Sequence, residues 1–173
     1  DELARRVRNL NVPVVCANYD FSGSALEGLV KPYVILEKAG KKIGVIGLLT
    51  DVTSVVDKDI VDQLDYRHPA EVANEYARIL KIDQRCDLVI CLTHLGYEGE
   101  NYNDPELAAS TRNVDVIVGG HSHTLLKDHK VVYNLDGEPV TIVTDWKWGL
   151  NIGNLKVDFA PQRLYGKYLD LVP

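Results

Sequence analysis

The first part of the chain alternates short apolar runs with turn-rich stretches. Apolar residues recur at helical spacing in residues 2–10 and predict a helix that ends before Pro13. Residues 12–16 are a run of apolar, strand-forming side chains that predicts a buried strand, and residues 19–28 are rich in turn formers. A helix followed by a buried strand is typical of the start of an α/β repeat.

The next segment predicts a hairpin and the most regular helix of the chain. Residues 33–37 and 43–49 are strand-like and flank Ala39-Gly40-Lys41-Lys42, a spacing typical of a β-hairpin. Residues 69–84 carry apolar side chains three and four positions apart, and Pro69 suits the first turn of a helix.

Two apolar strands then end in loops that contain glycine and histidine. Residues 87–92 are apolar on both faces, as in a central strand, and lead into Thr93-His94-Leu95-Gly96. A short helix is predicted at residues 105–111. Residues 114–118 repeat the strand pattern and lead into Gly119-Gly120-His121-Ser122-His123. This order of helices and strands predicts the α/β fold class.

The last part of the chain consists of short strand-like segments separated by turns, a pattern that predicts a β-meander. Asp136-Gly137 is the turn between the first two of its strands. The strands are expected at residues 131–134, 140–144, 150–159 and 164–169. The chain has no low-complexity linker and no internal repeat, so residues 1–173 are interpreted as a single domain.

Composition narrows the class of protein. The chain has 173 residues, of which 46% are hydrophobic and 25% charged, the balance of an ordinary globular domain. A net charge of -6 argues against a nucleic-acid polymer as partner, because such binding depends on clustered Lys and Arg. The longest apolar run, residues 43–49, is too short for a membrane span. The three cysteines (Cys16, Cys86 and Cys91) have no metal or disulfide spacing and are interpreted as small apolar residues.

The candidate chemistry lies in three histidines, His94, His121 and His123. Loops at the carboxyl ends of neighbouring strands converge at one edge of an α/β sheet, and neutral imidazole is a preferred ligand of zinc, manganese and iron. A single histidine after an apolar strand is more commonly a hydrogen-bonded structural residue, but three in equivalent loops favour a metal site. His68 and His129 lack such settings and are interpreted as surface residues.

These motifs resemble the calcineurin-like metallophosphoesterases, and within them the bacterial 5′-nucleotidase and UDP-sugar hydrolase group. The resemblance is carried by residues 14–19, 93–96 and 118–124 and extends over nearly the whole chain. It implies part of a four-layer α/β/β/α sandwich with mixed sheets. In that family the histidines at the places of His94 and His121 bind one metal ion, and the histidine at the place of His123 binds the other.

The rest of the family's site does not occur in this sequence. The family also uses an Asp-x-His, a bridging Asp in a Gly-Asp turn and an Asn-His turn, all normally earlier in the chain. The first residue is Asp1 and the chain has no Met. We therefore expect residues 1–173 to be the C-terminal part of an incomplete catalytic domain, with its N-terminal half and catalytic residues upstream of residue 1.

The resemblance also implies an activity. Two divalent ions (zinc, manganese, iron or similar) would share a carboxylate and activate a water for attack on the phosphorus of a nucleotide or another phosphate ester. The three histidines alone would hold at most one ion weakly, so this piece alone is expected to be inactive. The implied partners are the N-terminal half and a separate C-terminal substrate-binding domain, and an uncovered sheet would favour self-association. The implied location is the periplasm or the cell surface.

Two other interpretations stay open. The chain could be a non-catalytic binding or assembly module that retains the fold without the metals. It could also be a hydrolase of different ancestry with a single zinc ion, but it has no His-Glu-x-x-His spacing, and Glu98 and Glu100 suit a solvated loop.

Overall fold

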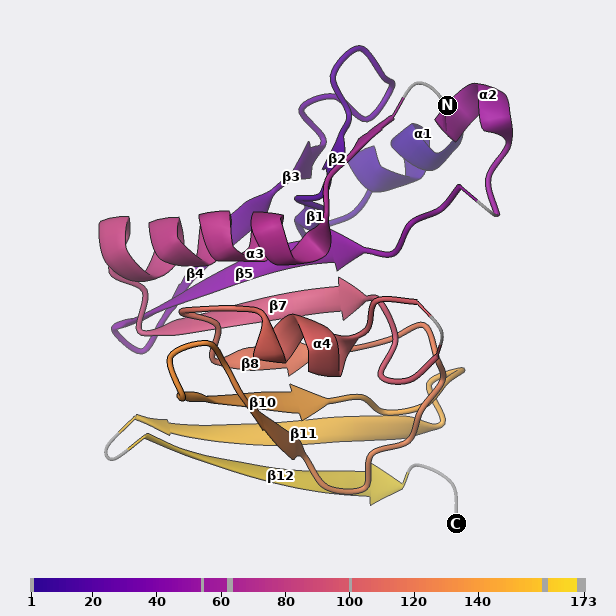
Figure 1. The fold of residues 1–173 in the computed structure, drawn as a ribbon. Helices are drawn as coiled ribbons and strands as arrows, with labels where there is room; N and C mark the ends of the chain where they lie inside the picture. The colour runs from indigo at the N-terminus through magenta and orange to yellow at the C-terminus, as the bar shows by residue number, and fades with distance from the viewer. Residues whose placement is uncertain (1, 54, 62–63, 100, 160–161, 171–173) are drawn as a thin grey trace.

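The computed structural model describes residues 2–53, 55–61, 64–99, 101–159 and 162–170. Its centre is a six-stranded sheet in the order β4-β5-β7-β8-β10-β9 (Figure 1). The strands are β4 (Tyr33–Lys38), β5 (Lys41–Leu49), β7 (Leu88–His94), β8 (Val116–Val118), β10 (Pro139–Val143) and β9 (Lys130–Tyr133). The four inner strands are parallel, and the edge strands β4 and β9 are antiparallel to their neighbours. The predicted mixed α/β fold is confirmed, and the four-layer arrangement stays a prediction.

Helices cover one face of this sheet. They are α3 (Pro69–Arg78), continued by the π-helix η1 (Ile79–Asp83), and α4 (Asp104–Ala109), which lie on the same side in Figure 1. The helices predicted at residues 69–84 and 105–111 are therefore confirmed. The largest fully buried apolar side chains are Ile46, Leu80, Leu107, Ile117, Ile142, Val72, Val89, Val116 and Val140.

The hairpin of β4 and β5 follows from its turn. Ala39 and Gly40 have φ angles of 52° and 74° and form the two-residue connection that matches the twist of antiparallel strands. The predicted hairpin is confirmed, but the strands pair from Lys38 opposite Lys41 to Tyr33 opposite Ile46, so the connection is two residues shorter than the expected residues 39–42.

The prediction of a buried strand at residues 12–16 is wrong in length and place. Only β1 (Val14–Val15) is extended; it is half-buried and pairs in parallel with β3 (Val30–Lys31), apart from the central sheet. The backbone after β1 lies directly against β5, since a Cβ atom on Gly47 would overlap the carbonyl oxygen of Val15 and the Ala17 N–H donates to the Gly47 carbonyl oxygen. An apolar run shows that a strand is partly buried, but not which strand it joins.

The other elements before α3 are short. The predicted N-terminal helix is confirmed as α1 and ends at Arg8, before Pro13. β2 and β6 pair with each other in a small antiparallel sheet, beside the turns expected at residues 19–28. The elements are α1 (Glu2–Arg8), β2 (Tyr19–Asp20), α2 (Lys58–Val61) and β6 (Asp65–Tyr66).

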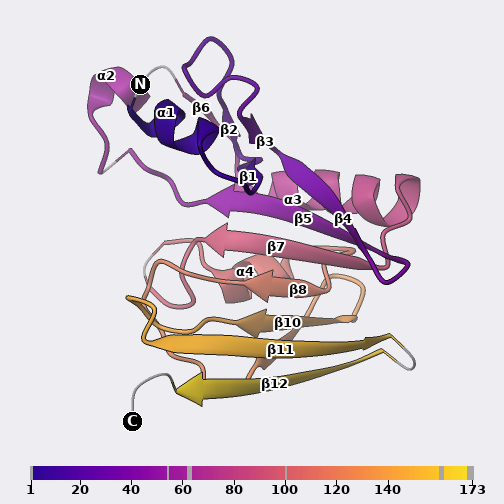
Figure 2. The same ribbon diagram turned by 180° about the vertical axis from the view of Figure 1, so that it is seen from behind.

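The C-terminal β-meander is a wrong prediction. β9 and β10 form the expected hairpin, but β10 also pairs in parallel with β8 and so extends the central sheet. β11 (Asn151–Phe159) and β12 (Gln162–Asp170) form a separate two-stranded sheet, which lies beside the β10 end of the central sheet when seen from behind (Figure 2). The strands were predicted from local pattern, which does not contain their order.

The cysteines pack as apolar residues. Cys86 and Cys91 are free and buried in the core, while Cys16 is free and half-buried. Burial raises the pKa of the Cys91 thiol to about 12, which fits a packing residue without chemistry. Among the described helices, none combines the length and the apolar content that crossing a bilayer requires.

Candidate metal centre

The three candidate histidines lie at the carboxyl ends of two adjacent strands. His94 is the last residue of β7, and His121 and His123 follow the end of β8 at Val118. The strands are parallel and pair as Leu92 opposite Val118, so their loops leave the sheet side by side. The rings of His94 and His121 are in edge contact, with centroids 4.9 Å apart and an interplanar angle of 76°. The predicted convergence of the two loops is therefore present.

The backbone of the second loop is unusual at the histidines themselves. His121 and His123 have φ angles of 80° and 54°, a region that non-glycine residues rarely adopt and that costs about 1–3 kcal/mol each. Gly119 and Gly120 could adopt such angles without steric cost, but the positive angles fall on the histidines. The glycines provide space instead. A Cβ atom on Gly120 would lie 3.4 Å from His94 Nδ1, and one on Gly119 would overlap a carboxylate oxygen of Asp104.

A chain of hydrogen bonds joins the two loops. The backbone N–H of Tyr97 donates to Ser122 Oγ at 2.9 Å, and Thr124 Oγ1 donates to Glu98 at 2.9 Å. The hydroxyls of Ser122 and Thr124 are also 2.9 Å apart, so the Ser122 hydroxyl donates to Thr124. Glu98 is exposed, as expected of a solvated loop, and is also bound to the second loop. Glu100 lies outside the described residues.

The electrostatics favour neutral imidazole. Partial burial lowers the pKa of His94, and the nearby His121 and His123 lower it further because a second positive charge is unfavourable there. Within the part of the chain that the structure describes, no hydrogen bond engages the ring nitrogens of these three histidines. Their lone pairs are therefore available to a divalent transition metal.

The ligand set is incomplete within these residues. The described ranges contain no group of three or more His, Cys, Asp or Glu side chains placed to hold one metal ion. His94 and His121 fit as two ligands of one ion by their chemistry and ring contact, but a stable centre needs further donors.

Asp104 is a part of this region that sequence reasoning missed. It is fully buried at the first turn of α4, and its Oδ1 accepts a hydrogen bond from Thr93 Oγ1 at 2.6 Å. Burial raises the pKa of the Asp104 carboxyl to about 7, against the lowering effect of the Thr93 bond. The capping box of Asn103 and Glu106 could be recognised in the sequence, but the burial of the residue between them could not.

The other two histidines stand apart from the centre. His68 is exposed, as predicted, and caps α3 because its Nδ1 accepts from the backbone N–H of Ala70 at 3.3 Å. His129 is half-buried beside Leu88 and Asp115, so it is more enclosed than the predicted surface residue.

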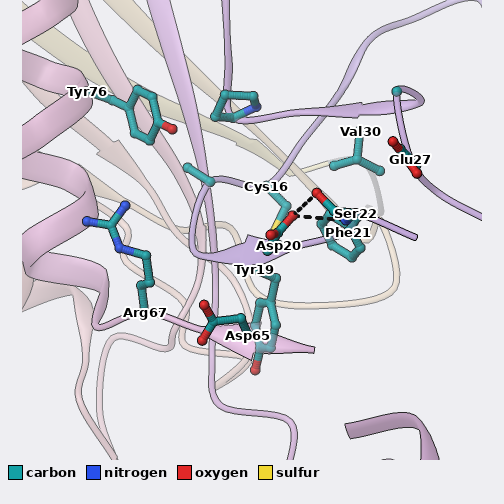
Figure 3. A pocket seen from close by; sticks show the side chains of 13 residues that line it. Cys16, Tyr19, Asp20, Phe21, Ser22, Glu27, Val30, Asp65, Arg67 and Tyr76 are labelled. Atoms are coloured by element: carbon teal, nitrogen blue, oxygen red, sulfur yellow. Dashed lines mark hydrogen bonds between the residues drawn. The ribbon is translucent and has the colours of Figure 1, made fainter. Parts of the chain in front are cut away.

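A polar pocket of about 360 Å³ lies away from the histidines, between β2, β6 and α3 (Figure 3). Three of its four charged side chains, all except Asp65, are already bonded within the protein. Asp20 accepts from the backbone N–H and the hydroxyl of Ser22, Glu27 accepts from the backbone of Gly23, and Arg67 pairs with Glu75 at 2.8 Å. We assign no ligand to this pocket.

No family model matches the chain. It is 30% identical to the trifunctional nucleotide phosphoesterase protein YfkN of Bacillus subtilis, over 85% of this chain and 11% of YfkN. It is also 30% identical to the protein UshA of Yersinia enterocolitica, over 93% of this chain and 33% of UshA. The crystal structure of a 5′-nucleotidase precursor from Thermus thermophilus matches with a TM-score of 0.84 and 32% identity, over 97% of this chain and 35% of that one.

The chain thus spans about a third or less of the length of these relatives. A structure of YfkN, described as a calcineurin-like phosphoesterase, also shares the fold, with a TM-score of 0.64 at 24% identity over 95% of this chain and 57% of that one. The chain is therefore homologous to one segment of the bacterial 5′-nucleotidases and calcineurin-like phosphoesterases.

Proposed function

We propose that the protein hydrolyses phosphate esters with the help of divalent metal ions, and that its substrates are nucleotides that lose their phosphate. The observation that carries this is the edge contact of His94 and His121 at the carboxyl ends of adjacent parallel strands, with ring nitrogens that form no hydrogen bond to the described residues. Nucleotide phosphate as substrate is supported by the names of the relatives, a nucleotide phosphoesterase and a 5′-nucleotidase precursor.

In this proposal His94 and His121 hold one ion and His123 contributes to a second. The ions would supply a bound water of lowered pKa and neutralise phosphate oxygens as the ester bond breaks. The histidines act as neutral ligands, which agrees with the lowered pKa of His94. The positive φ angles of His121 and His123 aim two side chains from one short turn, at a backbone cost that other interactions in the loop must offset.

The remaining ligands, in this proposal, come from protein outside these 173 residues. The described residues do not complete a ligand set, and the relatives are about three times longer or more. A further domain would then bind the nucleoside, and this piece by itself would be inactive. The open face of the sheet would pair with such a segment, or would self-associate in its absence. A periplasmic or cell-surface location is proposed on the family resemblance alone.

The test uses the full-length protein, because the proposed centre needs it. Metal content and the rate of phosphate release from nucleoside monophosphates are measured for the wild type, His121→Ala and His123→Ala. We expect bound divalent metal in the wild type and losses of rate of more than about 100-fold in both variants, since even outer-shell changes cost 10–100-fold.

His68→Asn is the matched control, because Asn keeps an N-cap acceptor at an exposed histidine away from the site. Its rate should stay within about twofold of the wild type. A wild-type protein with no bound metal and no rate would contradict the proposal and favour the binding or assembly module. A wild-type protein that binds a single metal ion and still releases phosphate from nucleoside monophosphates would favour a single-metal hydrolase.

A further inference from the structure

Asp104 contacts both histidine-bearing strand ends from the helix-covered face. Its Oδ1 accepts from the Thr93 hydroxyl at 2.6 Å, directly before His94 in the chain. Its backbone N–H donates to the carbonyl oxygen of Gly96 at 2.7 Å, two residues after His94. The loop that presents His94 is therefore held on both sides by one residue of α4.

The same carboxyl group reaches the second strand. A Cβ atom on Gly119 would overlap Asp104 Oδ2, so the carboxyl group occupies the space that any other residue at Gly119 would fill. The register of β7 and β8, with Leu92 opposite Val118, places Thr93 and Gly119 as the next neighbours on this face. Asp104 thus lies across the positions that directly follow the last pair between the two strands, where the two loops begin.

This arrangement is unfavourable for stability alone. Asp104 is 0% exposed, and its Oδ2 has no hydrogen-bond partner among the described residues. A buried polar atom without a partner costs free energy that an apolar side chain of similar size would not cost. Since packing alone does not account for a buried carboxyl group, its contacts with the two strand ends are the remaining structural reason for its presence.

We propose that Asp104 is the positioning residue that sets the placement of His94 relative to His121, by holding Thr93 and Gly119 on the opposite face of the sheet. The proposal rests on the proposed function, in which these two histidines bind metal. It also assigns a reason to Gly119, which is needed for space beside Asp104 rather than for its own backbone angle.

The first test changes the hydroxyl that Asp104 accepts from. Thr93→Val removes it at nearly constant shape, and Thr93→Ser restores it. The full-length protein is titrated with Co²⁺, and the imidazole ¹⁵N signals of His94 and His121 are recorded by NMR. Thr93→Val should weaken Co²⁺ binding about tenfold or more and shift both imidazole signals, while Thr93→Ser should stay within about threefold of the wild type.

Thr111→Val is the matched control. Thr111 is also fully buried, and its hydroxyl bonds the Ala108 carbonyl oxygen at the end of α4, away from both histidine loops. This variant should leave Co²⁺ affinity and both imidazole signals unchanged. Equal effects of Thr93→Val and Thr111→Val would overturn the proposal, because they would show a general response to losing a buried hydroxyl.

The second test uses the contact between Gly119 and Asp104. Gly119→Ala should weaken Co²⁺ binding and shift the His121 signals, because the new methyl group collides with the carboxyl group. Asp104→Ala removes that obstacle, so the double variant should bind Co²⁺ more tightly than Gly119→Ala alone. Strictly additive losses would overturn the proposal.

The two proposals fail separately. If wild-type protein binds no Co²⁺, the proposed function fails, and the imidazole signals of the same variants still decide whether Asp104 places the histidines. If wild type binds Co²⁺ but Thr93→Val leaves affinity and signals unchanged, only the positioning proposal fails.

Discussion

The side chains on the two faces of strand β7 differ in their exposure to solvent. On the helix-covered face Val89 and Cys91 are fully buried and Thr93 is 6% exposed, whereas the opposite face is buried at Leu88, at the start of the strand, and open at Leu92, which is 48% exposed. His94 belongs to the second face and is exposed as well. An apolar hollow of about 450 Å³ opens beside these two residues and extends to Leu3 and Val7 of α1.

One face of the sheet therefore contributes to stability, and the other carries the side chains of the candidate site. The covered face supplies the packed core, which fixes the strands and their ends. The open face presents the histidines to solvent and to a ligand, on a scaffold whose position the other face has already set. Substitutions at buried and exposed residues of the same kind test this division.

The largest effect should come from a cavity on the covered face. Ile117 of β8 is fully buried, so Ile117→Ala should lower the free energy of unfolding by about 2–5 kcal/mol. Leu92→Ala on the open face should cost about 1 kcal/mol or less, because Leu92 is half exposed. Urea unfolding of the 173-residue chain measures both. Similar losses would mean that the open face is covered in solution.

The pH dependence of stability should report the buried carboxyl group. The pKa of Asp104 is raised to about 7 from its ordinary 3.8, so between these values the folded state holds a proton that the unfolded chain has lost. The free energy of unfolding therefore falls as pH rises from about 4 to 7, by at most about 4 kcal/mol from this group. Asp104→Asn should remove this part of the slope. Parallel curves for the two proteins would contradict the assigned pKa.

Two hydrogen-bonded asparagines, one buried and one half-buried, should differ in how much their substitution lowers the free energy of unfolding. Asn18 is fully buried, and its amide donates to the Leu49 carbonyl oxygen and accepts from the Leu49 N–H, at 2.7 and 2.9 Å. Asn18→Ala should cost about 2 kcal/mol, because it leaves a strand end unsatisfied. Asn74 bonds Ala70, Ser110 and Arg112 but is only half-buried, so water can replace it. If Asn74→Ala costs more in thermal or urea unfolding, burial is not the deciding factor.

The smallest effects should come from ion pairs near the start of β7. Lys41 and Asp87 are 2.7 Å apart with side chains 41% and 31% exposed, so Lys41→Met should cost less than about 1 kcal/mol. Lys81 and Asp115 are equally close but only 26% and 25% exposed, whereas both aspartates accept a backbone hydrogen bond, Asp87 from Lys42 and Asp115 from Val89. Lys81→Met should therefore cost more. The difference should shrink in 1 M salt if it is electrostatic, and unfolding curves at two salt concentrations would show whether it does.

Much of the local structure could be predicted because its causes are local. The hairpin around Ala39 and Gly40 follows from its turn, and α3 from apolar spacing with Pro69 at its start. The histidine loops could be placed because two buried runs end directly before them. The strand expected at residues 12–16 and the C-terminal meander were wrong, since the same backbone hydrogen bonds can join a strand to many partners.

The site was predictable only in its outward-facing part. A histidine in a glycine-containing loop is visible in the sequence, and so is the Asn103–Glu106 capping box. The contact of Asp104 with Thr93 and Gly119 is not, because it depends on α4 lying across two strand ends. Nor does the sequence show that Ser122 and Thr124 connect their loop to Glu98.

Local sequence pattern specifies the α/β class, the positions of α1, α3 and α4 and of the inner strands, and the three histidines at or after the ends of two of those strands. Hydrophobic periodicity and turn chemistry act over a few residues, so these features depend only on residues that are close together in the sequence. Local pattern does not specify that β10 lies beside β8, that Leu92 and His94 of β7 stay exposed, or that Asp104 is buried against Gly119. These depend on contacts between segments far apart in the chain, whose free energy comes from burial and close packing of the whole domain.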